Sequence, residues 1–142
     1  SSLVSWLQGD SYYSLVSSAQ TQDNSGEFIF ARLGANDPDF NLRSEPAFIL
    51  RQKGQNHVFA NALETHGYFN ESIEASVGAR GLVERIEVLG HDDVATVVRV
   101  SLTTGKQYHF GISNQTGGAQ DGAHKVSFGG EVFQWTGPYA QL

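Results

Sequence analysis

The sequence of 142 residues contains no cysteine, no methionine and only three prolines. Without cysteine, the chain has no disulfide, no thiolate zinc site and no cysteine nucleophile. This absence does not fix a compartment, because a secreted or periplasmic bacterial protein is permitted disulfides but does not require them. Without methionine, Ser1 is not a translation start, and we expect the chain to begin inside a longer product.

Basic residues are scarce as well. Nine lysines and arginines stand against fifteen aspartates and glutamates, which gives a net charge of −6. This balance argues against binding to the phosphate backbone of nucleic acid. An acidic ligand is still compatible with it, because arginines hold a carboxylate through short-range bidentate bonds whatever the net charge. No apolar run approaches the roughly 18 residues of a helical membrane span, so we expect no membrane partner.

Apolar residues recur at every second position in short runs separated by Gly, Asn, Asp and Pro, a pattern typical of strands. We expect one all-β domain of about nine strands, arranged as an antiparallel β-sandwich or as stacked β-sheets. A closed barrel is the alternative. The expected strands cover residues 11–19, 27–33, 46–52, 56–63, 82–89, 94–102, 108–113, 125–128 and 131–135.

Turn chemistry suggests how some of these strands connect. Lys53-Gly54-Gln55 has the length and the glycine of a hairpin loop, so its two flanking strands are expected to pair. The strand 27–33 is apolar on both faces and is expected to be central in a sheet. Residues 67–79 show no clean period and are expected to form a long connection. A hairpin around Gly129-Gly130 closes the chain, and the residues after Pro138 are expected to fray.

Alternation along two expected strands bears on the chemistry. Val98 faces one side of its strand while Val97 and Arg99 face the other, so one face of this sheet is expected to be wetter. Tyr108 and His109 are adjacent in the next strand and therefore point to opposite faces. These two side chains cannot serve one substrate together.

Common cofactor and metal motifs are absent. No GxxxxGK[ST] or GxGxxG loop occurs in a strand-to-helix setting, and we expect no cofactor. Five histidines, at positions 57, 66, 91, 109 and 124, lie on separate expected elements without HExxH or helical i, i+4 spacing. A metal site would require several strands to converge on them, so no metal ligand is assigned.

His66 is the most informative histidine. It belongs to Glu64-Thr65-His66-Gly67, which ends a strand directly before the expected long connection. In a structural interpretation Glu64 and His66 brace the strand end. In a functional interpretation the carboxylate orients the imidazole at a site. Both interpretations remain open from the sequence.

Arginines and aromatics are the other candidates for contact with a sugar. Arg32, Arg43 and Arg51 surround a loop that carries Asp37 and Asp39, so salt bridges within the loop are their ordinary use. The functional alternative is that one of them, with Arg43 as the candidate, meets a sugar carboxylate. Exposed aromatic faces stack on sugar rings, which makes candidates of four residues, Tyr68, Phe69, Trp135 and Tyr139, whereas most of the nine phenylalanines belong in the core.

Two segments carry a resemblance to a known family. GEFIFARLGANDPDFNLRSEPAFILR and HVFANALETHGYFNES resemble the late β-sheet region of heparinase II/III-like polysaccharide lyases, most closely the exo-acting oligoalginate lyases. GANDPDFNLR and ETHG are the most specific parts, and the similarity extends from Tyr12 to the vicinity of Ile112. The resemblance implies an N-terminal α/α toroid ahead of stacked antiparallel sheets, an alginate-like acidic saccharide as substrate, and a periplasmic or secreted bacterial enzyme.

In that family a Tyr and His pair carries out β-elimination while Asn or Arg neutralises the uronate carboxylate. The resemblance implies that these groups, and the structural zinc ligands, lie upstream of Ser1, so it assigns no catalytic residue here. The connection after ETHG resembles a segment that approaches the substrate cleft. The candidate substrate-binding residues are Tyr68, Glu71, Glu74, Arg43 and His66.

Three functions remain at this stage. The favoured hypothesis is a non-catalytic β-domain of an alginate lyase that supports the fold and one wall of the substrate cleft. The second is an independent carbohydrate-binding module for acidic polysaccharide, which would use loop aromatics and arginines. The third is a free-standing enzyme with an unrecognised site.

Overall fold

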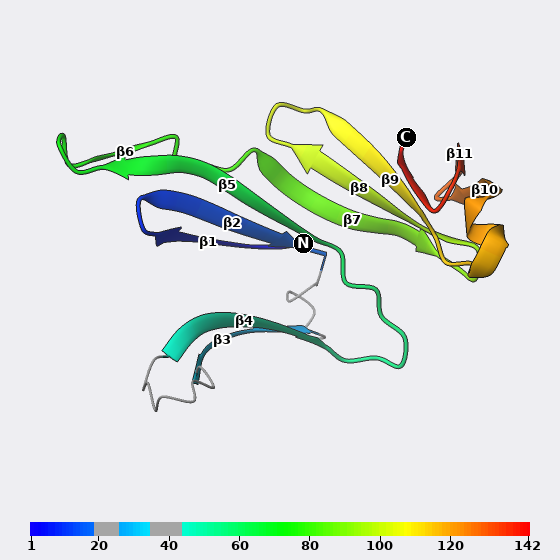
Figure 1. Ribbon diagram of the computed structural model, residues 1–142, viewed down its shortest axis with the longest axis horizontal. Coiled ribbons are helices and arrows are strands. Elements are labelled where there is room, and N and C mark those ends of the chain that lie inside the picture. Colours follow the sequence, from blue (N-terminus) through cyan, green and yellow to red (C-terminus); the bar gives the residue numbers. More distant parts are fainter. Residues whose placement is uncertain (19–25, 35–43) are drawn as a thin grey trace. The chain divides into compact units, whose positions relative to one another are not determined.

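The computed structural model describes residues 1–18, 26–34 and 44–142, with only the backbone described at Ser44 and Glu45. Two compact units contain these residues: residues 1–18 with 58–142 form the first, and residues 19–57 form the second (Figure 1). The single-domain organisation expected from the length stays a prediction.

The regular secondary structure of the described residues is almost entirely β-strand, which confirms the all-β prediction. They form twelve strands, more than the expected nine, and one short 3-10 helix, η1 (Gly117–Asp121). All strand pairs are antiparallel. The strands are β1 (Ser2–Gln8), β2 (Ser11–Ser17), β3 (Gly26–Gly34), β4 (Ser44–Gln52), β5 (Asn61–Asn70), β6 (Ala75–Val77), β7 (Val83–His91), β8 (Ala95–Leu102), β9 (Gln107–Ser113), β10 (Ala123–Phe128), β11 (Glu131–Thr136) and β12 (Tyr139–Gln141).

Among the helical residues that the structure describes, none forms a helix long and apolar enough to cross a membrane.

The first sheet has the strand order β1–β2–β5–β6. β1 and β2 form a hairpin around Gly9-Asp10, where Gly9 has a φ of 58° that glycine adopts without a steric penalty. The sequence predicts no strand ahead of Ser11, so β1 is a strand that the sequence pattern did not reveal. Its residues nevertheless alternate between half-buried and exposed positions, as a half-buried strand does.

In the second unit the described strands are β3 and β4, which pair along all nine of their residues. Phe28, Phe30 and Phe48 bring their rings together with centroid separations of 5.2 to 6.0 Å. Glu27 lies opposite Arg51 in the register and forms an ion pair with it. Within the described part of the chain β3 pairs with β4 alone, so the expectation that this strand is central in a sheet is wrong.

The expected hairpin between strands 46–52 and 56–63 is also wrong. β4 pairs with β3, whereas β5 begins only at Asn61 and pairs with β2. The reason lies in side-chain matching: Phe30 opposes Phe48 and Ile29 opposes Ile49, and such cross-strand apolar pairs stabilise a ladder. A loop of suitable length around Gly54 does not outweigh this match.

Residues 67–79 do not form the expected long connection. β5 continues to Asn70, a turn follows, and β6 pairs back onto β5. The register shows the cause, because Tyr12 opposes His66 while Ser11 opposes Tyr68, so Gly67 is an extra residue on β5. Such a β-bulge shifts the alternation of side chains by one position and hides the strand from a search for a period of two.

The second sheet has the strand order β12–β9–β8–β7. The tail that was expected to fray after Pro138 is β12, which pairs with β9, so this expectation is wrong. Two backbone hydrogen bonds flank the pairing. The Ser113 N–H donates to the Pro138 carbonyl at 2.7 Å, and the Leu142 N–H donates to the His109 carbonyl at 2.8 Å.

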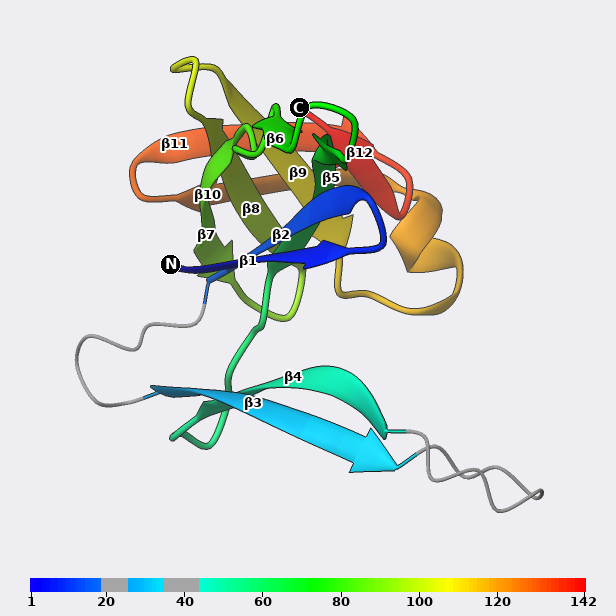
Figure 2. The same cartoon turned by 90° about the vertical axis from the view of Figure 1, so that its left-hand side faces the viewer.

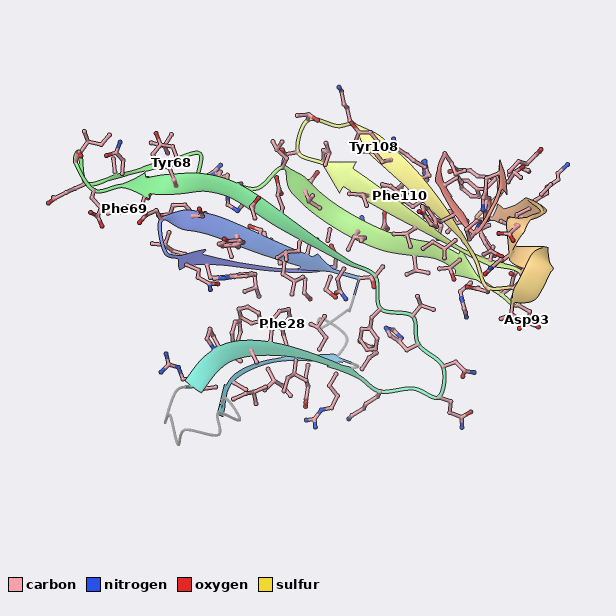
Figure 3. The ribbon with its side chains drawn as sticks, in the orientation of Figure 1. Phe28, Tyr68, Phe69, Asp93, Tyr108 and Phe110 are labelled. Carbon is pink, nitrogen blue, oxygen red and sulfur yellow. The ribbon has the colours of Figure 1, made fainter. Side chains whose placement is uncertain are left out.

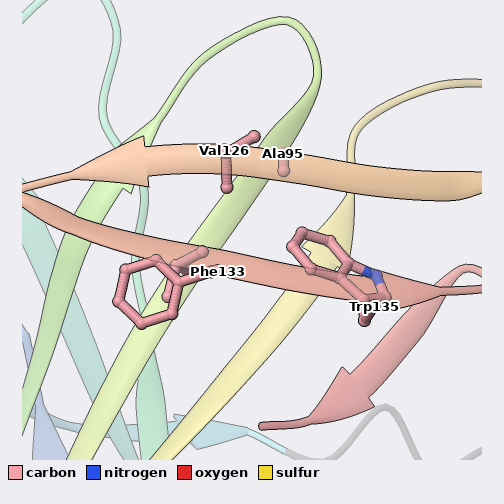
Figure 4. Close-up of a cluster of buried hydrophobic side chains, with 5 residues drawn as sticks. Ala95, Val126, Phe133 and Trp135 are labelled. Carbon is pink, nitrogen blue, oxygen red and sulfur yellow. The ribbon is translucent and has the colours of Figure 1, made fainter.

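The closing hairpin is confirmed as β10–β11, joined by Gly129-Gly130, and it runs across β7, β8 and β9 (Figure 2). Side chains between this hairpin and the second sheet form one buried cluster (Figure 4). Ala95 and Val97 come from β8, Val126 comes from β10, and Phe133 and Trp135 come from β11. The hairpin therefore covers one face of the second sheet.

Trp135 lies directly on the backbone of β9. A Cβ atom added to Gly111 would come within 2.9 Å of the indole ring, so only glycine leaves room for it there. The indole N–H donates to the Gly137 carbonyl at 3.1 Å. The indole N–H thus has a hydrogen-bond partner and the ring face packs against the strand, as a buried tryptophan requires.

A second buried cluster joins the first sheet to the second sheet. Val16 from β2, Ile86 from β7 and Val98 from β8 form it. Val98 faces this cluster while Val97 faces the closing hairpin, so both faces of β8 are covered there. The expectation of one wetter face is therefore wrong for the first half of this strand.

Replacement of Trp135 by alanine is expected to lower the free energy of unfolding by about 3–5 kcal/mol, because the buried ring leaves a cavity over β9. Val132→Ala is the control on the same strand, where the side chain is 57% exposed and the change should stay within about 0.5 kcal/mol. Urea unfolding of both variants checks this. Equal losses in the two variants would contradict the assignment of Trp135 to the core.

Candidate functional site

The ETHG segment joins the first sheet to the second sheet through a carboxylate. Glu64 on β5 accepts hydrogen bonds from the Leu82 N–H at 2.8 Å to each oxygen and from the Val83 N–H at 3.0 Å. These two N–H groups stand at the start of β7, which belongs to the other sheet. Gly81 makes the approach feasible, because a Cβ atom there would lie 2.7 Å from a Glu64 carboxylate oxygen.

His66 occupies the next position on the same face of β5 and has both ring nitrogens engaged. Nδ1 lies 3.2 Å from the Gly78 carbonyl, which only accepts, and Nε2 lies 2.7 Å from the Ser14 hydroxyl. In a neutral ring Nδ1 therefore carries the proton and Nε2 accepts from Ser14. Ser14 is buried and its oxygen also lies 2.7 Å from the Ser5 hydroxyl.

Tyr12 completes this polar group on β2. Its ring stacks on His66 with centroids 6.3 Å apart and an interplanar angle of 15°. Its hydroxyl lies 2.5 Å from the Ser76 hydroxyl on β6. A tyrosine and a histidine thus stand together here, but their polar atoms hold β2, β5 and β6 in place.

Gly67 brings two backbone segments into contact. It has a φ of 59°, and Gly78 across from it has a φ of 63°. A Cβ atom on Gly67 would lie 2.2 Å from the Gly78 carbonyl oxygen, so no side chain fits. Glu64, His66 and Gly67 of ETHG therefore each hold neighbouring segments of the fold together. We name these three residues, with the partners described above, the ETHG junction.

The turn that follows carries most of the sequence-predicted sugar contacts. Tyr68 lies near the end of β5 (Figure 3), and Glu71 and Glu74 lie in the turn between β5 and β6, all three exposed. Glu74 has a φ of 49°, which is uncommon for a residue with a side chain and marks a tight turn. Asn70 stabilises the turn, because its side-chain oxygen accepts from the Ser72 N–H at 3.0 Å.

The five predicted site residues do not form one cluster. Tyr68, Glu71 and Glu74 share one hairpin, while His66 belongs to the ETHG junction. Arg43 lies outside the residues that the structure describes.

A small cavity beside the ETHG junction adds residues that the sequence search missed. Its volume is about 310 Å³, and Ser5, Ser14, Arg80 and Glu84 are among the side chains that line it. No ion pair joins Arg80 to another residue in the described ranges. In the sequence, Arg80 could have been noticed as the one charged residue of Gly78-Ala79-Arg80-Gly81, a segment that follows the turn with the candidate sugar-binding residues.

A larger hollow lies over one face of the second sheet. It has a volume of about 810 Å³ between segment 58–62 and strands β8, β9 and β12, and none of the described residues that line it carries a charge. We name it the apolar groove and define it by Ile86, Val98, Val100, Phe110, Ile112 and Tyr139.

Tyr108 and His109 occupy opposite faces of β9, as alternation predicts. Tyr108 lines the apolar groove, and Figure 3 shows it on the same strand as Phe110. His109 packs against Phe133, which belongs to the buried cluster beneath the closing hairpin, with ring centroids 5.5 Å apart. The two residues therefore share no cavity.

Comparison with known proteins gives relatives of one kind. No protein-family model matches the chain. An alginate lyase of Stenotrophomonas maltophilia is 34% identical over 98% of this chain, and an exo-oligoalginate lyase of Saccharophagus degradans is 31% identical over 94% of it. The matched part makes up 18% of each relative, so the chain spans less than a fifth of the length of these curated relatives.

Gly67 and Gly129 have nearly the same φ, but only Gly67 is in close contact with another backbone segment. Replacing each by alanine therefore distinguishes the cost of backbone strain from the cost of the close contact at the ETHG junction. Gly129→Ala, at a φ of 60° with open space around it, is expected to cost about 1–2 kcal/mol of unfolding free energy. Gly67→Ala has the same backbone cost and also collides with the Gly78 backbone, so its loss should exceed that of Gly129→Ala by about 2 kcal/mol. Denaturant unfolding measures both variants, and equal losses would contradict the close contact.

Proposed function

We propose that this relative of the alginate lyases is a non-catalytic β-sheet part of a longer lyase, where it supports the fold and one wall of the substrate cleft. The observation that carries the proposal is the match itself, which covers nearly all of this chain and less than a fifth of either relative. The heparinase II/III-like resemblance adds an N-terminal α/α toroid as the partner, and the periplasm or the cell exterior as the location.

The chemistry of β-elimination supports a non-catalytic role. Removing the proton beside a uronate carboxylate requires a base within about 3 Å of that proton and a group that neutralises the carboxylate. His66 and Tyr12 stand together, but Ser14, the Gly78 carbonyl and Ser76 engage their polar atoms. These contacts give the pair a structural use and leave it poorly suited to act as base and acid.

The turn after β5 is the best candidate for the cleft wall. Tyr68 offers an exposed ring face for stacking on a sugar, while Glu71 and Glu74 offer oxygens that accept from sugar hydroxyls. The ETHG junction holds the base of this turn through His66 and Gly67. Such a support keeps the contact residues preorganised, which limits the entropy lost when a sugar binds.

An assay with oligoalginate separates this proposal from its alternatives. The purified 142-residue chain is expected to produce no new ultraviolet absorbance from an unsaturated uronate, while the longer polypeptide that contains it does so. Product formation by the chain alone would identify a free-standing enzyme and contradict the proposal. Saturable binding of oligoalginate without turnover, together with an inactive longer polypeptide, would identify a carbohydrate-binding module instead.

Two substitutions of Tyr68 test its stacking role in the longer lyase. Tyr68→Ala is expected to raise KM for oligoalginate by about tenfold with kcat nearly unchanged, because loss of a stacking contact weakens binding of substrate and transition state alike. Tyr68→Phe keeps the ring and should stay within about twofold of wild type. Steady-state kinetics measure both. Wild-type KM in Tyr68→Ala would remove Tyr68 from the cleft wall.

A further inference from the structure

We infer that the apolar groove is the surface on which the rest of the lyase packs, its occupant being an apolar segment of that polypeptide outside these 142 residues. The inference rests on the proposed function and adds the place of contact. Three observations support it: the exposed apolar side chains of the groove, its lack of charge, and the length of the relatives.

The groove leaves large apolar side chains in contact with water. Tyr139 is 75% exposed, Ile112 is 42% exposed and Phe110 is 37% exposed. Tyr139 on β12 stands directly opposite Ile112 on β9 in the register, so these residues form one continuous patch. Contiguous exposed apolar surface of this kind marks an interaction site more often than a free surface.

The groove continues a buried core. Val98 and Ile86 line it and also belong to the cluster that packs against Val16 of the first sheet. Toward β9 and β12 the same sheet face opens to solvent, although the closing hairpin covers its other face. A further apolar segment placed over Phe110 and Ile112 would extend this cluster across the whole sheet face.

The absence of charge around the groove argues against the polysaccharide as occupant. A uronate polymer carries one carboxylate on each sugar, and its binding requires arginine, lysine or dense hydrogen-bond donors. None of the described residues that line the groove carries a charge, and Thr96, one of the few polar ones, already bonds His91 and Asn114. An apolar protein segment fits this lining, whereas an acidic sugar does not.

The length of the relatives indicates where a segment that covers the groove would come from. The matched stretch is 18% of each lyase, so more than four-fifths of those chains lies outside the part that corresponds to this one. A covalently connected polypeptide is present at high effective concentration and needs little affinity to cover the groove. A connected segment therefore fits better than an unrelated protein that would have to bind by its own affinity.

Hydroxyl-radical labelling compares the 142-residue chain with the longer lyase that contains it. Labelling of Tyr139 is expected to fall by about fivefold or more in the longer lyase, because a covered interface core excludes water. Tyr68 is the internal control and should keep its labelling within about twofold, because the cleft wall stays open to solvent. An active lyase in which Tyr139 labels as fast as in the isolated chain would overturn the inference and leave the proposed function intact.

Substitutions give a second measurement with its own control. Tyr139→Thr is expected to lower the inactivation temperature of the longer lyase by about 5 °C, whereas in the 142-residue chain it shifts Tm by less than about 2 °C. Val132 is exposed but lies outside the groove, so Val132→Thr should change the inactivation temperature of the longer lyase and the Tm of the 142-residue chain by less than about 2 °C each. An equal loss in both proteins, or a dimer of the 142-residue chain that Tyr139→Thr dissociates, would show that this chain fills its own groove and would overturn the inference. An inactive longer polypeptide would count against the proposed function.

Discussion

The bonds from the Glu64 carboxylate to the N–H groups of Leu82 and Val83 connect two sheets that share no strand ladder. A carboxylate that accepts from several backbone N–H groups forms charge-assisted bonds, which are stronger than neutral ones. Gly81 and Gly67 permit the close approaches that this arrangement needs. The exposed turn, the small cavity and the start of β7 all depend on this junction for their positions.

β8 is the second organising element, because it serves both buried clusters. Val97 packs under the closing hairpin and Val98 packs toward the first sheet. The faces of the second sheet differ in how completely they are covered. The hairpin closes one face over Trp135, whereas the other face is buried near Val16 and open near Tyr139. A chain that forms part of a larger fold would leave such a face for its neighbour.

Short-range signals predicted the strand content and the closing hairpin well. The alternation in 123–136 around Gly129-Gly130 is local, and so is the strand character of β8 and β9. Pairing partners were not predictable in the same way, because the choice of β3 over β5 as partner of β4 depends on the match of Phe48 with Phe30 across the ladder. The sequence predicts the end of this strand at residue 63 and a connection over 67–79, whereas β5 runs to Asn70, because the bulge at Gly67 interrupts the period on which recognition of a strand depends.

The candidate site was predictable only in part. Sequence alone singled out ETHG because a histidine and a carboxylate lie at an expected strand end, and the residues after it because they show no clean period. It missed Ser5, Ser14 and Arg80, which come together only when β1, β2 and the connection between β6 and β7 meet. The polar partners of His66 arise from β2 and from Gly78, far apart in the chain, and no spacing within a single segment reveals them.

The central claim is that this chain belongs to a longer lyase. Size fractionation of native extract from the source organism, with an antibody to this chain and an oligoalginate assay on each fraction, tests it most directly. The account predicts that antibody signal and lyase activity elute together at a mass several times the 15.4 kDa of this chain. A signal confined to 15.4 kDa and separate from the activity would contradict it.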